Sequence, residues 1–138
     1  MPSKLNPYIS FKDNAKQAIE FYKTIFGGTL TMSTFKEGGA PVGPADENKI
    51  MHSMLIADNG MTIMCSDTPP GMPYNPGSNI SISLSGEDEQ ELKGYWDKLS
   101  EGAKISMPLS KAPWGDTFGM LKDKFGISWL VNVNAKKS

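Results

Sequence analysis

The sequence predicts an α+β protein made of two tandem β-α-β-β-β modules, residues 1–67 and 79–138. Strand and helix periodicities follow one another in the same order in both halves. Matching residues also recur at a constant spacing, because Phe21-Tyr22 and Gly28 correspond to Tyr95-Trp96 and Gly102, each 74 positions later. The intervening segment 68–78, "TPPGMPYNPGS", has the Pro- and Gly-rich composition of a linker.

The first module contains one helical pattern and four strand patterns. Asp13 and Asn14 are favourable N-caps, and apolar residues recur at helical spacing from Ala15 until Gly27-Gly28, where left-handed backbone can end the helix. Asp58-Asn59-Gly60 is a strong signal for a hairpin between the last two strands. The predicted strands are Leu5–Phe11, Thr29–Phe35, Ile50–Ala57 and Met61–Ser66.

The second module repeats this order. Ser85, followed by Asp88 three residues later, predicts a capping box. One face of a helix that Gly102 ends is predicted from Leu92, Tyr95, Trp96 and Leu99. The turn "KDKFG" around Asp123 corresponds to the Asp58-Asn59-Gly60 turn with one residue inserted. The predicted strands are Asn79–Leu84, Ala103–Leu109, Trp114–Leu121 and Ile127–Val133.

Composition excludes several classes of partner. The net charge is −1 and all fourteen basic residues are Lys, so the chain lacks the basic surface that nucleic acid requires. The sequence contains no run of eighteen apolar residues, so it predicts no membrane-spanning helix. The N-terminus has no long apolar stretch typical of a secretory signal, and the single Cys65 cannot form an internal disulfide. We therefore expect a cytoplasmic protein with no nucleic-acid or membrane partner.

His52 is the only histidine, and it lies in a segment that also contains Cys65 and Asp67. Strand alternation places His52, Met54 and Ile56 on one side of their strand. Three interpretations are open: a hydrogen-bonded core histidine, a ligand-contacting or acid–base histidine with Asp67 as its catalytic partner, or a metal ligand. The expected hydrogen-bond partners of His52 are Asp67, Asn79 and Ser81.

Three blocks of the sequence resemble the vicinal oxygen chelate superfamily, and within it the PhnB-like group. They are "PYISF…AIEFYKTIFGG" at Pro7–Gly28, "KIMHSMLI…DNG…IMCSD" at Lys49–Asp67 and "WGDTFGMLKDKFGISW" at Trp114–Trp129. The resemblance implies a glyoxalase-like fold, in which curled mixed sheets surround a cleft, and a homodimer. In relatives that use a metal, His and Glu ligands come from the first and last strand of each module. The matching positions here, Asn6, Met64, Asn79 and Leu130, offer no such ligand, so no metal and no cofactor are expected.

The resulting functional prediction is a metal-free protein that binds a small molecule. Its expected ligand-binding residues are His52, Met64, Asn79, Trp114 and Trp129, on the principle that apolar pockets carry a few placed polar groups. Two enzymatic alternatives stay open: a metal-dependent lyase, isomerase or dioxygenase, and a metal-free acid–base catalyst using His52. Members of the group are often described as methyltransferases. No strand here leads through a Gly-rich turn into a helix, as a nucleotide-type cofactor would require.

Overall fold

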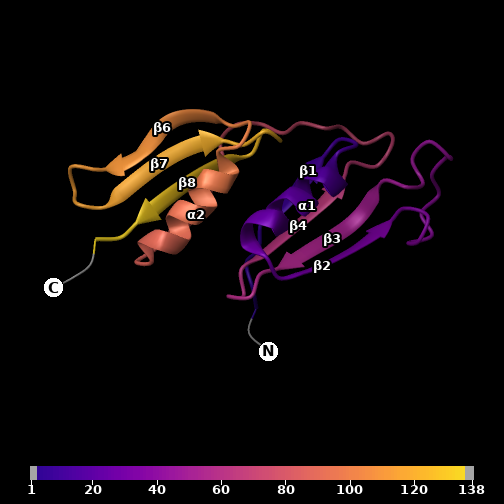
Figure 1. Ribbon diagram of the computed structural model, residues 1–138. Helices are drawn as coiled ribbons and strands as arrows, with labels where there is room; N and C mark the ends of the chain where they lie inside the picture. The colour runs from indigo at the N-terminus through magenta and orange to yellow at the C-terminus, as the bar shows by residue number, and fades with distance from the viewer. Residues whose placement is uncertain (1–2, 136–138) are drawn as a thin grey trace. The chain divides into compact units, whose positions relative to one another are not determined.

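A computed structural model describes residues 3–135 of the chain. The described chain divides after Pro76 into two compact units. Each unit is a four-stranded mixed sheet with one helix along one of its faces, as Figure 1 shows for each unit separately. This agrees with the predicted α+β class and with the predicted order of elements in both halves. Within residues 3–135, no helix has the length and apolar character needed to cross a membrane.

The first unit has the strand order β1-β4-β3-β2. Strand β1 runs parallel to β4, whereas β3 is antiparallel to both β2 and β4. The elements of this unit are β1 (Tyr8–Phe11), α1 (Ala15–Phe26), β2 (Thr29–Thr34), β3 (Ile50–Ile56) and β4 (Thr62–Asp67).

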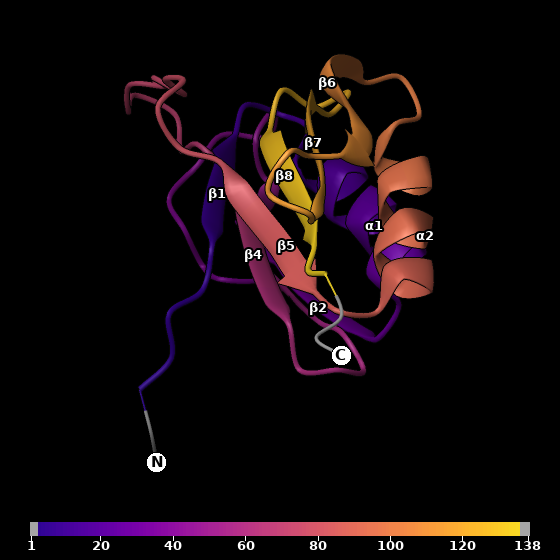
Figure 2. The ribbon, with the colours of Figure 1, turned by 90° about the vertical axis from the view of Figure 1, so that its left-hand side faces the viewer.

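The second unit has the equivalent strand order, β5-β8-β7-β6. Strand β5 is parallel to β8, and β7 is antiparallel to β6 and β8. Figure 2 gives a second view, in which α2 again lies beside the strands of its own sheet. The elements are β5 (Ile82–Gly86), α2 (Glu89–Leu99), β6 (Lys104–Lys111), β7 (Thr117–Lys122) and β8 (Ser128–Val133).

The structure confirms Asn14 as the N-cap position of α1 and corrects the start of α2. Ser85 belongs to β5, so the predicted capping box is wrong, and Asp88 itself is the N-cap, with its Oδ1 accepting from the Glu91 N–H at 3.0 Å. Asn14 is the N-cap of α1 but makes no side-chain cap bond. The Ala15 N–H instead donates to Oδ1 of Asp67, at the end of β4, at 2.9 Å. A carboxylate that is distant in sequence therefore replaces the local cap of α1.

The Asp67–Ala15 bond identifies the face of the first sheet that α1 covers. Since side chains alternate along a strand, Cys65 points to the same face as Asp67, and its antiparallel partner Ser53 does too. The opposite face has no helix of its own unit, and we call it the helix-free face. Its residues are Tyr8, Ser10, Thr29, Thr31, Ser33, His52, Met54, Ile56, Thr62, Met64 and Ser66. The predicted grouping of His52, Met54 and Ile56 on one side is confirmed.

Strand pairing corrects the alignment of the two repeats. Ser53 pairs with Cys65 and Gly119 with Val131, so the last two strands of each unit are related by a shift of 66. The turn keeps this shift, because Ala57 N bonds to Met61 O as Asp123 N bonds to Ile127 O. Asp123 is therefore the counterpart of Ala57, and the predicted match to Asp58 with an inserted residue is wrong.

The first strands of the two units are related by a different shift. Tyr8 is opposite Met64, and Ser83 is opposite Leu130, which gives a shift of 75 instead of the expected 73. The repeat counterpart of Asn6 is thus Ser81 and not Asn79. Both first strands also begin later than predicted, at Tyr8 and Ile82. Asn6 and Asn79 consequently lie before their strands.

Candidate functional site

The helix-free face of the first unit contains a polar pair that joins β1 to β3. The Tyr8 hydroxyl lies 3.3 Å from Nδ1 of His52, and their rings are 5.8 Å apart between centroids. The two residues are not direct strand neighbours. Tyr8 is opposite Met64 and His52 is level with Ser66, so the Tyr8 side chain reaches diagonally across β4. The expected partners of His52 were Asp67, Asn79 and Ser81, and the partner that the structure shows is Tyr8.

The surroundings of this pair are apolar and hydroxylated. Met54 and Met64 are paired across β3 and β4, and both are half-buried beside the Tyr8–His52 pair. Ser33 is paired with His52 from β2, and Ser66 lies between His52 and Ser10. None of the residues of the helix-free face carries a carboxylate or an ammonium group. The face thus combines two adaptable thioethers with hydroxyls and one imidazole.

Asp67 lies on the other face of the same sheet and has a different role from the one considered for it. Its side chain is only 3% exposed. Oδ1 accepts from Ala15 N and Oδ2 from Ile50 N, each at 2.9 Å, so the carboxylate ties α1 and β3 to the end of β4. The structure does not bring Asp67 and His52 together, because the sheet lies between them. The structure therefore does not pair His52 with Asp67 as acid and base. The Asp67 carboxylate instead holds α1 and β3 to the sheet.

Three predicted ligand-binding residues belong to the second unit and lie in different environments. Trp129 is fully buried, and its Nε1 donates to Oδ2 of Asp123 at 2.8 Å. Trp129 is the partner of Leu121 on the α2-covered face, so its indole belongs to the core. Trp114 was predicted to lie on a strand, but the structure places it outside β7. It lies in the turn before β7 and is 65% exposed, with its ring 6.0 Å from that of Phe118. Asn79 is exposed in the segment before β5.

The positions expected for metal ligands do not fit a divalent metal. Met64 and Leu130 occupy equivalent places, each opposite the first strand of its unit. The corrected repeat replaces Asn79 by Ser81, which again is neither imidazole, thiolate nor carboxylate. Cys65 is fully buried on the α1-covered face. Across residues 3–135, no three His, Cys, Asp or Glu side chains gather in a group that could hold a metal ion.

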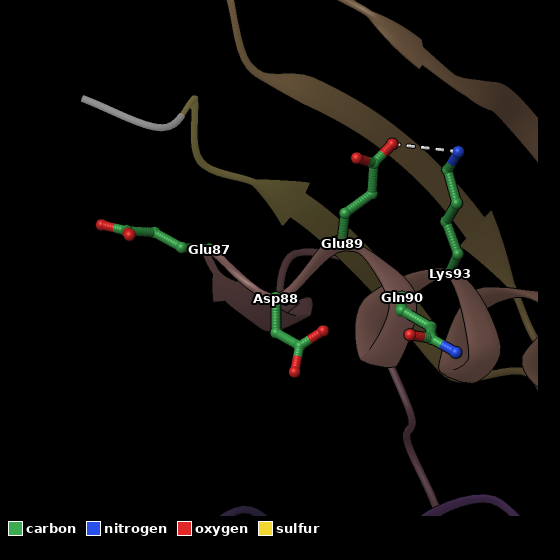
Figure 3. Close-up of a pocket in the computed structure, with 5 residues that line it drawn as sticks. All are labelled: Glu87, Asp88, Glu89, Gln90 and Lys93. Atoms are coloured by element: carbon green, nitrogen blue, oxygen red, sulfur yellow. Dashed lines mark ion pairs between the residues drawn. The ribbon is translucent and has the colours of Figure 1, made fainter. Parts of the chain in front are cut away.

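Two surface hollows are lined by residues that do not belong to the helix-free face. The larger, of about 630 Å³, surrounds the start of α2 and is lined by Glu87, Asp88, Glu89, Gln90 and Lys93 (Figure 3). Its charges serve the helix, since Asp88 is the N-cap and Glu89 pairs with Lys93 at 3.0 Å. Because these groups have local roles and are exposed, the hollow has the character of a helix terminus and not of a binding site.

The smaller hollow, of about 240 Å³, contains an ion-pair cluster around Lys49. The Lys49 Nζ lies 2.7 Å from Asp13 Oδ1 and 2.6 Å from Asp46 Oδ1. Hydrogen bonds to these two carboxylates raise the pKa of Lys49 above its ordinary value. The cation is thus already compensated within the chain, which leaves Tyr8–His52 and its neighbours as the candidate site.

Sequence reasoning missed Tyr8, although a signal was present. In "YISF" the fully buried Phe11 marks the core-facing side of β1, so alternation puts Tyr8 and Ser10 on the other side. What the sequence could not supply was the register of β1 against β4. That register is what carries Tyr8 to His52.

Comparisons with known proteins agree with this architecture. A family model described as 3-demethylubiquinone-9 3-methyltransferase matches residues 3–132. Protein YjdN of Escherichia coli K12 is 31% identical, over 94% of each chain. The crystal structure of protein PA1353 from Pseudomonas aeruginosa is 32% identical, with a TM-score of 0.83 over 98% of this chain and 100% of that one.

A putative 3-demethylubiquinone-9 3-methyltransferase, PhnB protein, from Bacillus cereus is 28% identical, with a TM-score of 0.71 over 94% of this chain and 98% of that one. A glyoxylase/bleomycin resistance protein/dioxygenase domain from Frankia sp. EAN1pec is 14% identical and shares the fold, with a TM-score of 0.67 over 100% and 96% of the two chains. The chain therefore belongs to the family described as 3-demethylubiquinone-9 3-methyltransferase, a PhnB-like family with the glyoxalase/bleomycin resistance/dioxygenase fold.

Proposed function

We propose that this protein binds a small amphipathic molecule on the helix-free face of its first unit. The observation that carries the proposal is the Tyr8–His52 pair, set beside the half-buried Met54 and Met64. Ligand sites are mostly apolar and use a few placed polar groups to orient the ligand. Methionine adapts its shape to different apolar surfaces. A polar pair next to two methionines meets both requirements.

The methyltransferase activity in the family's description is not part of this proposal. The Gly-rich segment "GGAPVG", residues 38–43, leads through turns into β3 and does not open a helix. A helix N-terminus after a Gly-rich turn is what commonly holds the phosphates of a nucleotide-type cofactor. The residues of this segment therefore do not fit such a cofactor. Acid–base catalysis by His52 would also need a partner other than Asp67.

The proposal can be tested with Nile red, a neutral apolar dye whose fluorescence rises on binding to protein. We expect His52→Ala to weaken dye binding by about tenfold to a hundredfold, which corresponds to losing one or two good contacts. The thermal midpoint should change little, because Tyr8, the partner of His52, is 49% exposed and can bond to water instead.

Lys23→Ala, on the exposed surface of α1, is the matched control and should leave dye binding unchanged. Met64→Ala should weaken binding as well, since Met64 shares the helix-free face with His52. A lower melting temperature of His52→Ala with unchanged dye affinity would show that His52 is structural and would contradict the proposal.

Assembly as a homodimer is a second part of this proposal. Within residues 3–135, the strands at the ends of the two sheets, which include β2 and β6, each have one unpaired edge, and such edges favour pairing with another copy. Strand β6 also exposes two apolar side chains, Ile105 and Met107, which a second copy could cover. Light scattering at micromolar concentration should give twice the chain mass of 15.0 kDa. A monomer mass would count against assembly without affecting the ligand-binding proposal.

A further inference from the structure

We infer that Tyr8 fixes His52 in the tautomer with its ring hydrogen on Nε2, so that the site selects a neutral ligand carrying a hydrogen-bond acceptor. This inference rests on the proposed binding role of the helix-free face. The contact that carries it is the 3.3 Å approach of the Tyr8 hydroxyl to Nδ1 of His52. It makes Tyr8 a positioning residue and His52 Nε2–H the group that meets the ligand.

The direction of the Tyr8–His52 hydrogen bond follows from the chemistry of the two groups. A neutral imidazole has one nitrogen that donates and one that accepts, and the bond made by one nitrogen determines the role of the other. A phenol is a stronger acid than the N–H of a neutral imidazole, and an imidazole nitrogen is a stronger base than a phenol oxygen. The favoured arrangement is therefore the Tyr8 O–H donating to Nδ1, which leaves the hydrogen on Nε2.

The charge of the ligand follows from the composition of the helix-free face. The described residues of this face are hydroxyls, thioethers, one isoleucine and the imidazole, with no ammonium or carboxylate among them. Placing an ionised ligand against such a face removes it from water without an opposite charge to compensate. A neutral, largely apolar ligand with a carbonyl, ether or ring-nitrogen acceptor fits the two methionines and the Nε2–H together.

The tautomer can be measured directly because His52 is the only histidine in the chain. Protein labelled with ¹⁵N at histidine gives one pair of ring-nitrogen signals, whose chemical shifts report which nitrogen carries the hydrogen. At about pH 8.5, where an ordinary imidazole is neutral, we expect the Nε2–H form to dominate. Tyr8→Phe should shift the tautomer ratio toward Nδ1–H by about two- to tenfold, the effect of one hydrogen bond. A dominant Nδ1–H form, or a ratio unchanged in Tyr8→Phe, would overturn the inference.

The ligand class can be tested with three tricyclic probes of one shape: fluorenone, fluorene and fluorene-9-carboxylate. We expect fluorenone to bind about tenfold more tightly than fluorene, the effect of one hydrogen bond to a neutral donor, and more tightly than the carboxylate. His52→Ala should remove the preference for fluorenone. Equal or tighter binding of the carboxylate, or a preference that survives in His52→Ala, would overturn the ligand class. If no probe binds, the proposed function fails, whereas the tautomer measurement still decides the role of Tyr8.

Discussion

The two units share a backbone plan but differ in where they place polar groups. On the helix-free face of the first unit, Tyr8 and His52 form a hydrogen-bonded pair. The corresponding positions of the second unit, on the strand-pairing shifts of 75 and 66, are Ser83 and Phe118. Met64 corresponds to Leu130, so the apolar positions are kept. The first unit thus has a hydrogen-bonded pair where the second has a serine and a phenylalanine, whereas the second unit has Asn132 at the position of Ser66, bonded to Asp116.

The cores differ in a compensating way. The first unit has Ala57 and Ile63 where the second has Asp123 and Trp129, and the Asp123 carboxylate accepts from the Trp129 indole and from the Phe125 and Ile127 N–H groups. Ala57 and Ile63 of the first unit are both apolar, whereas Asp123 and Trp129 of the second unit are both polar and are bonded to each other. Within residues 3–135, no buried side-chain nitrogen or oxygen lacks a hydrogen-bond partner, so the cost of an unpaired polar group is avoided.

Asp67→Val is expected to lower the stability most. It gives the first unit the valine that the second unit has at the equivalent position, Val133. The change would leave the N–H groups of Ala15 and Ile50 buried without their acceptor. At about 1–3 kcal/mol for each of the two unsatisfied groups, the free energy of unfolding should fall by about 2–6 kcal/mol. Urea denaturation followed by tryptophan fluorescence measures this change.

Asp67→Asn is the control for that variant, since one amide oxygen can still accept from one of the two donors. It should fall between Asp67→Val and the unaltered protein. A loss in Asp67→Val no larger than in Asp67→Asn would mean that the two carboxylate bonds do not hold α1 and β3 to the sheet.

Gly119→Ser is expected to cause the next largest loss of stability. It gives the second unit the serine that the first unit has at the equivalent position, Ser53. A Cβ at Gly119 would lie 2.8 Å from Cη2 of Trp96 and 2.9 Å from Cα of Leu109. Overpacking of this kind costs about 1–3 kcal/mol. The helix residue that corresponds to Trp96 in the first unit is the smaller Tyr22, so the first unit has a larger strand residue beneath a smaller ring.

The double variant Gly119→Ser/Trp96→Tyr tests this exchange by placing the first unit's pair of residues in the second unit. We expect it to recover part of the stability that Gly119→Ser loses, as measured by the same urea denaturation. Additive losses from the two substitutions would show that the ring at position 96 and the strand residue at 119 do not compensate for each other.

Sequence periodicity alone predicted much of the fold. The order of the elements, the end of α1 at Gly27, and the shared side of His52, Met54 and Ile56 agree with the structure. These features depend on local geometry: the repeat of a helix or strand and the backbone freedom of glycine. They can be read from neighbours along the chain. The second helix instead ends at Leu99 with Ser100 as its C-cap, before the predicted stop at Gly102. The start of β1 and the cap of α2 were placed wrongly, because element ends depend on contacts with other elements.

Tertiary structure alone decided which side chains meet. Strand alternation defines the faces of Tyr8 and His52, but only the register of β1 on β4 brings the hydroxyl to Nδ1. Likewise, Asp67 is a carboxylate near a histidine in the sequence, yet the sheet separates the two and turns Asp67 toward α1. A period of two fixes the face of a residue, whereas its neighbours across the sheet depend on pairings between distant segments, which one sequence does not specify.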